Sequence, residues 1–232
     1  GTDKLQADLK QKISKTKKEL QRGRSAGGKR SKTARIPRQG AGRAVIIGAP
    51  NVGKSQLLTS LTRATPEVAF YPFSTREPIP GMMPWEDVMV QLIDTPPITP
   101  DVLDSNTLGL IRGADLVLLV VDAGSDDGIE DAQAVVSKLE ETSTRLAAST
   151  YLDEDDIGVT FTQTFLVFNK IDDPEAEDRI QLFHEFCDFS FPEYRVSAQE
   201  MTGLETLRDA IYEKMDVVRV YTKMPKEKQP DY

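Results

Sequence analysis

The residues best suited to chemistry form a glycine-rich loop, GAPNVGKS, that runs from Gly48 to Ser55. It fits the pattern GxxxxGK[ST] and stands between an expected strand and an expected helix, the context in which this pattern binds a polyphosphate. Backbone N–H groups at a helix N-terminus hold phosphate oxygens, and glycines let the chain wrap closely around them. The expected phosphate-binding residues are Asn51, Val52, Gly53, Lys54, Ser55 and Gln56.

The charged and hydroxyl groups near this loop have separate expected roles. Lys54 would place its ammonium on the β and γ phosphates, and Ser55 would offer its hydroxyl to Mg²⁺. Asp94 ends an apolar run over 88–93, so its carboxylate would reach the same Mg²⁺ shell. Mg²⁺ is therefore the expected cofactor, and a glycine-rich turn without a ligand is the disfavoured alternative.

A second polar group indicates a guanine base. Asn169-Lys170-Ile171-Asp172 follows an apolar run over 165–168, and Ser197-Ala198 follows the next expected strand. Together they resemble the NKxD and SA base-recognition motifs of the GTPase superfamily. In that resemblance Asp172 accepts hydrogen bonds from guanine N1–H and the exocyclic amine, and adenine has no such donor pair, which disfavours an ATP-using enzyme. The implied guanine-binding residues are Asn169, Lys170, Asp172, Ser197, Ala198 and Gln199.

These loops need a scaffold that brings strand ends together. Apolar runs predict strands at 44–47, 88–93, 116–121, 165–168 and 194–196, and helical patterns lie at 54–61, 105–112, 129–146, 175–189 and 203–215. Strands that alternate with helices imply a mostly parallel sheet with helices on both faces and ligands at the carboxyl ends of the strands. The expected fold is α/β, a P-loop NTPase three-layer sandwich of the small-GTPase type, over residues 43–216.

The first 43 residues differ from the rest in charge. They carry 14 Lys and Arg against 3 Asp and Glu, or +11, whereas the rest carries 15 against 34, or −19, and the two sum to the chain's −8. Residues 1–42 are expected to form a basic amphipathic helix over 4–21 and then a flexible linker. Such a segment is typical of an arm that contacts RNA or the ribosome, and a solvated tail is the alternative.

Other classes of protein are disfavoured by composition. No apolar run approaches the roughly 18 residues that span a bilayer, and the charged N-terminus lacks the apolar core of a signal peptide, so a soluble, cytoplasmic protein without a membrane partner is expected. The lone cysteine, Cys187, excludes an internal disulfide framework. No feature of the sequence predicts DNA binding.

Three tracts carry a family resemblance: the glycine-rich loop, Tyr71-Pro72-Phe73-Ser74-Thr75, and Asp94-Thr95-Pro96. They resemble the Obg/DRG branch of translation-associated GTPases, of the TRAFAC class, and the resemblance covers residues 43–215. It implies GTP and GDP as ligands, Thr75, Asp94 and Pro97 as switch residues, and Ser55, Thr75 and Asp94 as Mg²⁺ ligands. Residues 217–232 resemble the start of a TGS domain, as in a bacterial-type DRG-like protein truncated at that point.

Two departures from the family pattern bear on catalysis. Pro97 stands where the DxxG motif has a glycine whose N–H contacts the γ-phosphate, and proline has no N–H to give. Ile98 follows, where many small GTPases place a water-orienting glutamine. No catalytic residue can therefore be named, and slow hydrolysis of GTP is expected. The alternative is a docking module that binds GTP or GDP with little hydrolysis.

Asn51 raises the question of a second ion. In relatives that use potassium, the asparagine at this loop position helps to bind K⁺, which supplies positive charge where an arginine finger would act. An amide oxygen can coordinate such an ion, or it can simply brace the loop. The sequence favours K⁺ activation and leaves the bracing role open.

Overall fold

The computed structural model describes residues 36–62, 77–149 and 158–217. Seven strands occur in these ranges: β1 (Arg43–Ile47), β2 (Ile79–Trp85), β3 (Val88–Asp94), β4 (Leu116–Asp122), β5 (Thr144–Ala147), β6 (Thr160–Asn169) and β7 (Glu193–Arg195). The helices are α2 (Lys54–Thr62), α3 (Ser105–Arg112), α4 (Gly128–Glu140), α5 (Ala176–Phe186) and α6 (Leu204–Lys214). No helix among the described residues is both long and apolar enough to cross a bilayer.

The strands form one sheet in the order β2-β3-β1-β4-β6-β5, and β7 also pairs with β6. Every pairing is parallel except that of β2 with β3. β6 is long enough to pair with β5 along its first half and with β7 along its second half. Since β1, β3, β4 and β6 are neighbours and parallel, their carboxyl ends lie along one edge of the sheet, where the expected site residues follow.

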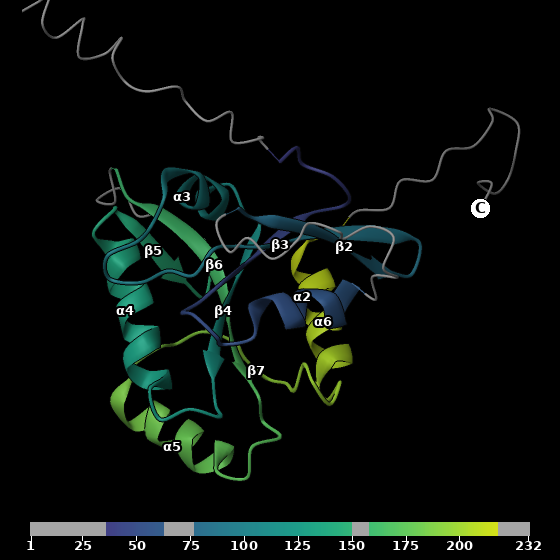
Figure 1. The fold of residues 1–232 in the computed structure, drawn as a ribbon. Coiled ribbons are helices and arrows are strands. Elements are labelled where there is room, and N and C mark those ends of the chain that lie inside the picture. Colours follow the sequence, from purple (N-terminus) through teal and green to yellow (C-terminus); the bar gives the residue numbers. More distant parts are fainter. Residues whose placement is uncertain (1–35, 63–76, 150–157, 218–232) are drawn as a thin grey trace, which may run out of the picture. The chain divides into compact units, whose positions relative to one another are not determined.

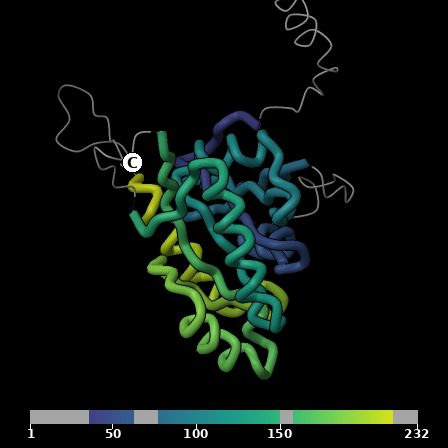
Figure 2. The backbone as a smooth tube through the Cα atoms, turned by 90° about the vertical axis from the view of Figure 1, so that its left-hand side faces the viewer, coloured from purple at the N-terminus to yellow at the C-terminus, as the bar shows by residue number. Residues whose placement is uncertain are grey.

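Helices cover both faces of this sheet (Figure 1). α2 and α6 pack together on one face, and α3, α4 and α5 lie on the other, with α4 beside α5 (Figure 2). β1 and β4 consist wholly of buried residues because both of their faces are covered, which is why the sequence shows continuous apolar runs there. The expected mostly parallel, three-layer α/β fold is confirmed.

Two strands were not predicted. β2 has the sequence IPGMMPW, and prolines argue against a strand in most positions. β2 is an edge strand, and Pro80 and Pro84 lie four residues apart, so their missing N–H groups belong to the same side of the strand. An edge strand tolerates proline where that side faces away from its neighbour. β5 was also missed, because three of its four residues were assigned to the end of the helix expected over 129–146.

Two helices end earlier than predicted. The helix expected over 129–146 stops at Glu140, and the chain turns through Ser143, which has φ +57°, before β5 begins at Thr144. The helix expected over 175–189 ends at Phe186, and the backbone of Cys187 is extended. Apolar residues beyond each helix continue the helical spacing by chance, since they pack from a strand or a loop instead.

Contacts with the sheet are made by residues before Arg43 as well. The N–H of Ala41 donates to the Met89 carbonyl at 2.8 Å, and the Gln91 side chain donates to the Pro37 carbonyl at 3.0 Å. Arg38 pairs with Asp115. Residues 37–42, which were expected to belong to the linker, are thus attached to the domain. Their contacts are hydrogen bonds and an ion pair, which leave no hydrophobic pattern in the sequence.

Arg208 on α6 holds the end of α2. Its side chain donates to the carbonyls of Ser60 at 2.8 Å and Leu61 at 3.1 Å, and it pairs with Glu205 at 2.6 Å. These carbonyls belong to the last turn of α2, where a helix leaves its acceptors without internal partners. Arg208 is only 2% exposed, so a distant guanidinium caps the helix that begins at the glycine-rich loop.

Replacing Arg208 with Met is expected to lower the free energy of unfolding by about 2–4 kcal/mol, because two buried carbonyls lose their donors. Urea denaturation of the nucleotide-free protein would measure this. Arg195→Met is the matched control, since Arg195 is 42% exposed and pairs with the carboxylates of Glu177 and Glu193 at the surface. Equal stability of the two variants would show that Arg208 does not cap α2.

Candidate nucleotide-binding site

The glycine-rich loop connects β1 to α2 and has an unusual backbone. Gly53 has φ +92°, and a Cβ placed on it would lie 2.3 Å from Nδ2 of Asn169. Asn51 has φ +63°, in the left-handed region that few residues other than glycine adopt. The loop therefore needs glycine at position 53 for both its conformation and its close approach to the expected base motif.

Lys54 folds back over the loop that carries it. Its Nζ donates to the carbonyls of Ala49 at 2.8 Å and Gly48 at 3.2 Å, and the residue is 6% exposed. Burial lowers the pKa of Lys54 to about 8, and the charge of Asp94 acts in the opposite direction. A buried ammonium that binds two backbone carbonyls of the glycine-rich loop is an arrangement that a phosphate anion can complete.

Ser55 and Asp94 face each other at the ends of neighbouring elements. The Ser55 hydroxyl donates to Oδ2 of Asp94 at 2.5 Å, and the other carboxylate oxygen, Oδ1, is buried without a hydrogen-bond partner. Burial raises the pKa of Asp94, opposed by the Ser55 hydrogen bond and by the charge of Lys54. Since β1 and β3 are parallel neighbours, the sheet brings these two groups together.

These two residues fit a Mg²⁺ site. A buried carboxylate oxygen without a partner is costly, and a hydroxyl and a carboxylate are oxygen ligands of the kind that Mg²⁺ prefers. Among the described residues no group of three or more His, Cys, Asp or Glu could hold a metal ion, so protein ligands here would be few. Mg²⁺ commonly takes one or two protein ligands together with phosphates and water. Thr75, the third expected ligand, lies outside the described residues.

The segment after Asp94 is bound to β1 and to the glycine-rich loop. Thr95 donates to the Ile46 carbonyl through both its N–H, at 3.2 Å, and its hydroxyl, at 2.7 Å. The N–H of Ile98 donates to the Gly48 carbonyl at 3.2 Å, while Pro97 is half-buried. The side chain of Ile98 is 1% exposed, so it packs in the core.

Asn169 joins the expected base motif to the phosphate loop. Its Nδ2 donates to the Val52 carbonyl at 2.9 Å, and its Oδ1 accepts from the Ala198 N–H at 3.1 Å. The side chain is 1% exposed, and both partners lie in loops far from it in sequence. One buried amide therefore connects the three loops that the sequence assigned to phosphate and base.

The other expected base residues border the same site. Lys170, with φ +64°, pairs with Asp122 at 2.5 Å, and Asp172 is exposed. The Ser197 hydroxyl is buried and accepts from the Glu200 N–H at 2.9 Å, which fixes the Ser-Ala turn. Gln199 and Gln56 are exposed. The structure thus places the polar ends of β1, β4, β6 and β7 around one edge of the sheet.

A family model agrees with this geometry. The model described as "50S ribosome-binding GTPase" matches residues 43–170, which is more than half of the chain. The chain belongs to this GTPase family. The match begins at β1 and ends within the Asn169 motif, so it includes the glycine-rich loop, Asp94 and the first two residues of the base motif.

Individual relatives of this GTPase confirm the Obg/DRG resemblance. It is 30% identical over 188 residues to GTPase Obg of Corynebacterium urealyticum, covering 77% of this chain and 36% of that protein. It is 36% identical over 146 residues to Developmentally-regulated G-protein 1 of Arabidopsis thaliana, covering 60% of this chain and 35% of that protein. The chain therefore spans about a third of the length of either relative.

Solved structures share the fold of this GTPase. The G domain of the T. maritima FeoB iron transporter is 25% identical, with a TM-score of 0.51, covering 74% of this chain and 97% of that one. A bacterial selenocysteine-specific elongation factor, EF-Sec, is 20% identical, with a TM-score of 0.53, covering 77% of this chain and 29% of that one. The second likeness concerns the fold alone.

Two residues that support the site of this GTPase were missed from sequence. Asp122, 8% exposed, binds the Gly124 N–H at 2.9 Å through one oxygen and Lys170 through the other. The sequence did offer a signal for Asp122, since this acid follows the apolar run 116–121 in the way that Asp94 follows the apolar run 88–93. Ser60 donates to the Ala198 carbonyl at 2.9 Å from inside α2, where nothing in the sequence distinguishes it.

Proposed function

We propose that this protein is a guanine-nucleotide switch that hydrolyses GTP to GDP and phosphate with Mg²⁺. The observation that carries the proposal is Asn169, whose amide binds both the phosphate loop and the Ser-Ala turn. A polyphosphate on the loop and a purine beside Asp172 would thereby be held at a fixed separation. Family membership supports the same conclusion.

Each group has a defined part in this proposal. Lys54 releases the carbonyls of Gly48 and Ala49 and donates to phosphate oxygens instead, and Ser55 and Asp94 would hold Mg²⁺. The ion supplies neutralisation of the charge on the β and γ phosphates. Asp172 accepts from guanine N1–H and the exocyclic amine, the Lys170 stem covers the base, and the Ala198 N–H donates to O6.

Hydrolysis is proposed to be slow. Ile98 occupies the position of a water-orienting residue, and its side chain is buried. Pro97 has no N–H for the γ-phosphate, and the N–H of Ile98 is engaged by Gly48. Catalysis then depends only on positioning the GTP and on the positive charges near its phosphates. We therefore expect a turnover in the range of unassisted switch GTPases, about 10⁻⁴ to 10⁻² s⁻¹.

Phosphate release from GTP with Mg²⁺, measured in KCl and in NaCl at known nucleotide occupancy, tests this function. We expect slow release that is about tenfold faster in KCl, because K⁺ on Asn51 would add positive charge near the phosphates. Asn51→Gly, which adopts the same positive φ without strain and lacks the amide oxygen, should lose the advantage of KCl. Full occupancy without release in either salt would instead support the docking module that binds GTP or GDP with little hydrolysis.

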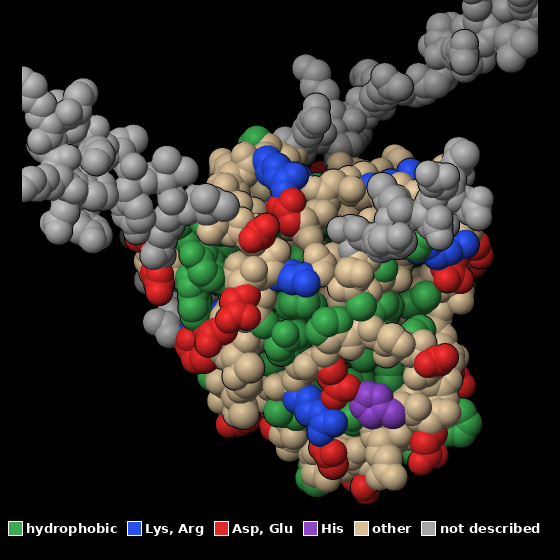
Figure 3. All heavy atoms as spheres, turned by 180° about the vertical axis from the view of Figure 1, so that it is seen from behind, with side chains coloured by type: hydrophobic (Ala, Val, Ile, Leu, Met, Phe, Trp, Pro, Cys, Tyr) green, Lys and Arg blue, Asp and Glu red, His purple; other side chains and the backbone are tan. Residues whose placement is uncertain are grey.

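The partner is proposed to be RNA or the ribosome, contacted through the basic residues before Arg43. Basic side chains on the face shown in Figure 3 are isolated among acidic ones and form no broad patch there. The net −19 of residues 44–232 likewise makes the domain itself a poor ligand for phosphate backbones.

Deletion of residues 1–35 is expected to weaken binding to ribosomes or RNA at least tenfold at low salt and to flatten its salt dependence, since counterion release is lost. GDP affinity should not change. Co-sedimentation across a series of KCl concentrations would measure the first quantity and a GDP titration the second. Unaltered sedimentation of the shortened protein would mean that the segment is only a solvated tail.

A further inference from the structure

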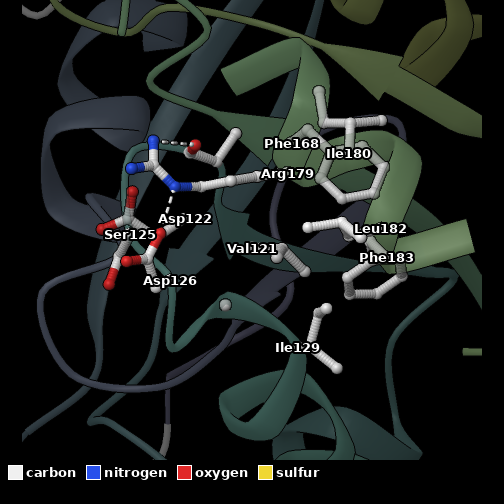
Figure 4. A pocket seen from close by; sticks show the side chains of 12 residues that line it. Val121, Asp122, Ser125, Asp126, Ile129, Phe168, Arg179, Ile180, Leu182 and Phe183 are labelled. Atoms are coloured by element: carbon white, nitrogen blue, oxygen red, sulfur yellow. Dashed lines mark hydrogen bonds and ion pairs between the residues drawn. The ribbon is translucent and has the colours of Figure 1, made fainter. Parts of the chain in front are cut away.

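The side chain of Arg179 connects two loops beside the base motif. It projects from the first half of α5 and is 18% exposed. Its guanidinium pairs with Asp126 at 2.6 Å, Asp173 at 2.8 Å and Glu175 at 2.6 Å. Figure 4 shows this group reaching from α5 toward the loop that follows β4, where Asp126 lies. Three carboxylates thus bind one guanidinium.

The first of these loops carries the expected guanine acceptor. Asp173 follows Asp172 directly, and its N–H donates to the Lys170 carbonyl at 3.1 Å, which closes the turn. The Asp173 carboxylate accepts from the Glu175 N–H at 2.9 Å and from Arg179 at 2.8 Å, and these bonds hold the pKa of Asp173 below its usual range. Because Asp173 is held by these hydrogen bonds, the backbone of the preceding residue, Asp172, has little conformational freedom.

The second loop, which follows β4, binds the side chain of Lys170. Lys170 pairs with Asp122 at the end of β4, and Asp126 lies four residues further along the same segment. Lys170 also has φ +64°, a conformation that costs free energy and persists only where the surroundings impose it. Arg179 therefore connects the two segments that impose this backbone conformation on Lys170, because it pairs with Asp126 in one and with Asp173 in the other.

Side-chain packing beside Arg179 is incomplete. A cavity of about 140 Å³ lies behind Arg179, between α4 and α5 (Figure 4). Its apolar lining includes Ile129, Phe168 and Ile180. At this edge the guanidinium and its carboxylates therefore add to two direct links between the loops, the Lys170–Asp122 pair and the Ala123 N–H, which donates to the Asn169 carbonyl at 2.9 Å.

We propose that Arg179 is a positioning residue that sets the preference for guanine by holding the Asp172 turn in place. The proposal rests on the proposed function, since it requires Asp172 to be the guanine acceptor. A single exposed ion pair contributes little to such a geometry. Arg179 differs because its side chain is only 18% exposed and binds three carboxylates, which come from both loops and from the start of α5. Its removal would break the link between Asp173 and Asp126 and leave the turn held by its backbone hydrogen bonds alone.

The test compares GDP with inosine diphosphate in the wild type and in Arg179→Gln, Arg179→Lys and Arg145→Gln. Inosine keeps N1–H and lacks the exocyclic amine, so the ratio of the two Kd values reports how well Asp172 faces both donors. In Arg179→Gln we expect GDP affinity to fall about tenfold, inosine diphosphate affinity about twofold, and the ratio about fivefold. Arg179→Lys should restore part of the ratio, and Arg145→Gln should match the wild type.

A role limited to folding would give a different result. A fold defect lowers the fraction of protein that binds, equally for both nucleotides, and leaves the ratio of Kd values unchanged. An unchanged ratio in Arg179→Gln, with the wild type preferring GDP, would overturn the positioning role while leaving the proposed function intact. A wild type that does not distinguish GDP from inosine diphosphate would instead remove Asp172 as the guanine acceptor and the positioning role with it.

Discussion

Asp172→Asn is expected to weaken GDP binding about a thousandfold and to make xanthosine diphosphate the preferred ligand. The carboxylate accepts from both guanine donors, and a site built on such bonds rejects a base that lacks them by about 10⁴–10⁵. An asparagine turns one acceptor into a donor, which suits the C2 carbonyl of xanthine. Competition against a fluorescent nucleotide measures both affinities.

The control for this substitution is Asp178→Asn. Asp178 is exposed on the first turn of α5, so it shares the charge change and lies close to the same loop. Its GDP affinity should stay within about twofold of the wild type. If Asp172→Asn binds GDP as tightly as Asp178→Asn does, guanine is not recognised by this loop.

Asp94→Asn is expected to separate function from stability. GTP turnover should fall at least about a hundredfold, because Mg²⁺ loses an anionic ligand. The nucleotide-free protein should become more stable by about 1 kcal/mol, since the variant replaces a buried carboxylate that has one oxygen without a partner. Phosphate release and urea denaturation are the two measurements.

Asp104→Asn is the matched control for Asp94→Asn. The Asp104 carboxylate caps α3 and accepts from the N–H groups of Asn106 and Thr107, both at 2.9 Å. Its substitution should leave turnover unchanged and give no gain in stability. A loss of stability in Asp94→Asn would mean that the carboxylate contributes to the fold and is not held there at a cost for metal binding.

The parts of the molecule that could be predicted from the sequence are those whose role in the fold leaves a recognisable local pattern of residues. Buried parallel strands give continuous apolar runs, which is why β1, β3 and β4 were found nearly to the residue. The loop after β1 and the motif at Asn169 were recognised because polyphosphate and guanine each demand particular residues at fixed spacing. The contact between Asn169 and Val52 follows from the parallel order of the strands.

The remaining features depend on contacts that no local pattern carries. β2 contains two prolines and is a strand only because it lies at the edge of the sheet. Arg208 and Arg179 look like ordinary charged residues of amphipathic helices, and only the fold brings one to the end of α2 and the other to the base loop. The buried position of Ile98 likewise depends on the path of the chain after Asp94.

The most direct test of the account is a titration of the nucleotide-free protein with GDP and with ADP, in the presence of Mg²⁺. We predict a Kd for GDP in the micromolar range or below and a Kd for ADP at least about a thousandfold higher, because only guanine offers the donor pair that Asp172 accepts. Equal affinities would contradict the assignment of the Asn169-to-Asp172 loop as a guanine site.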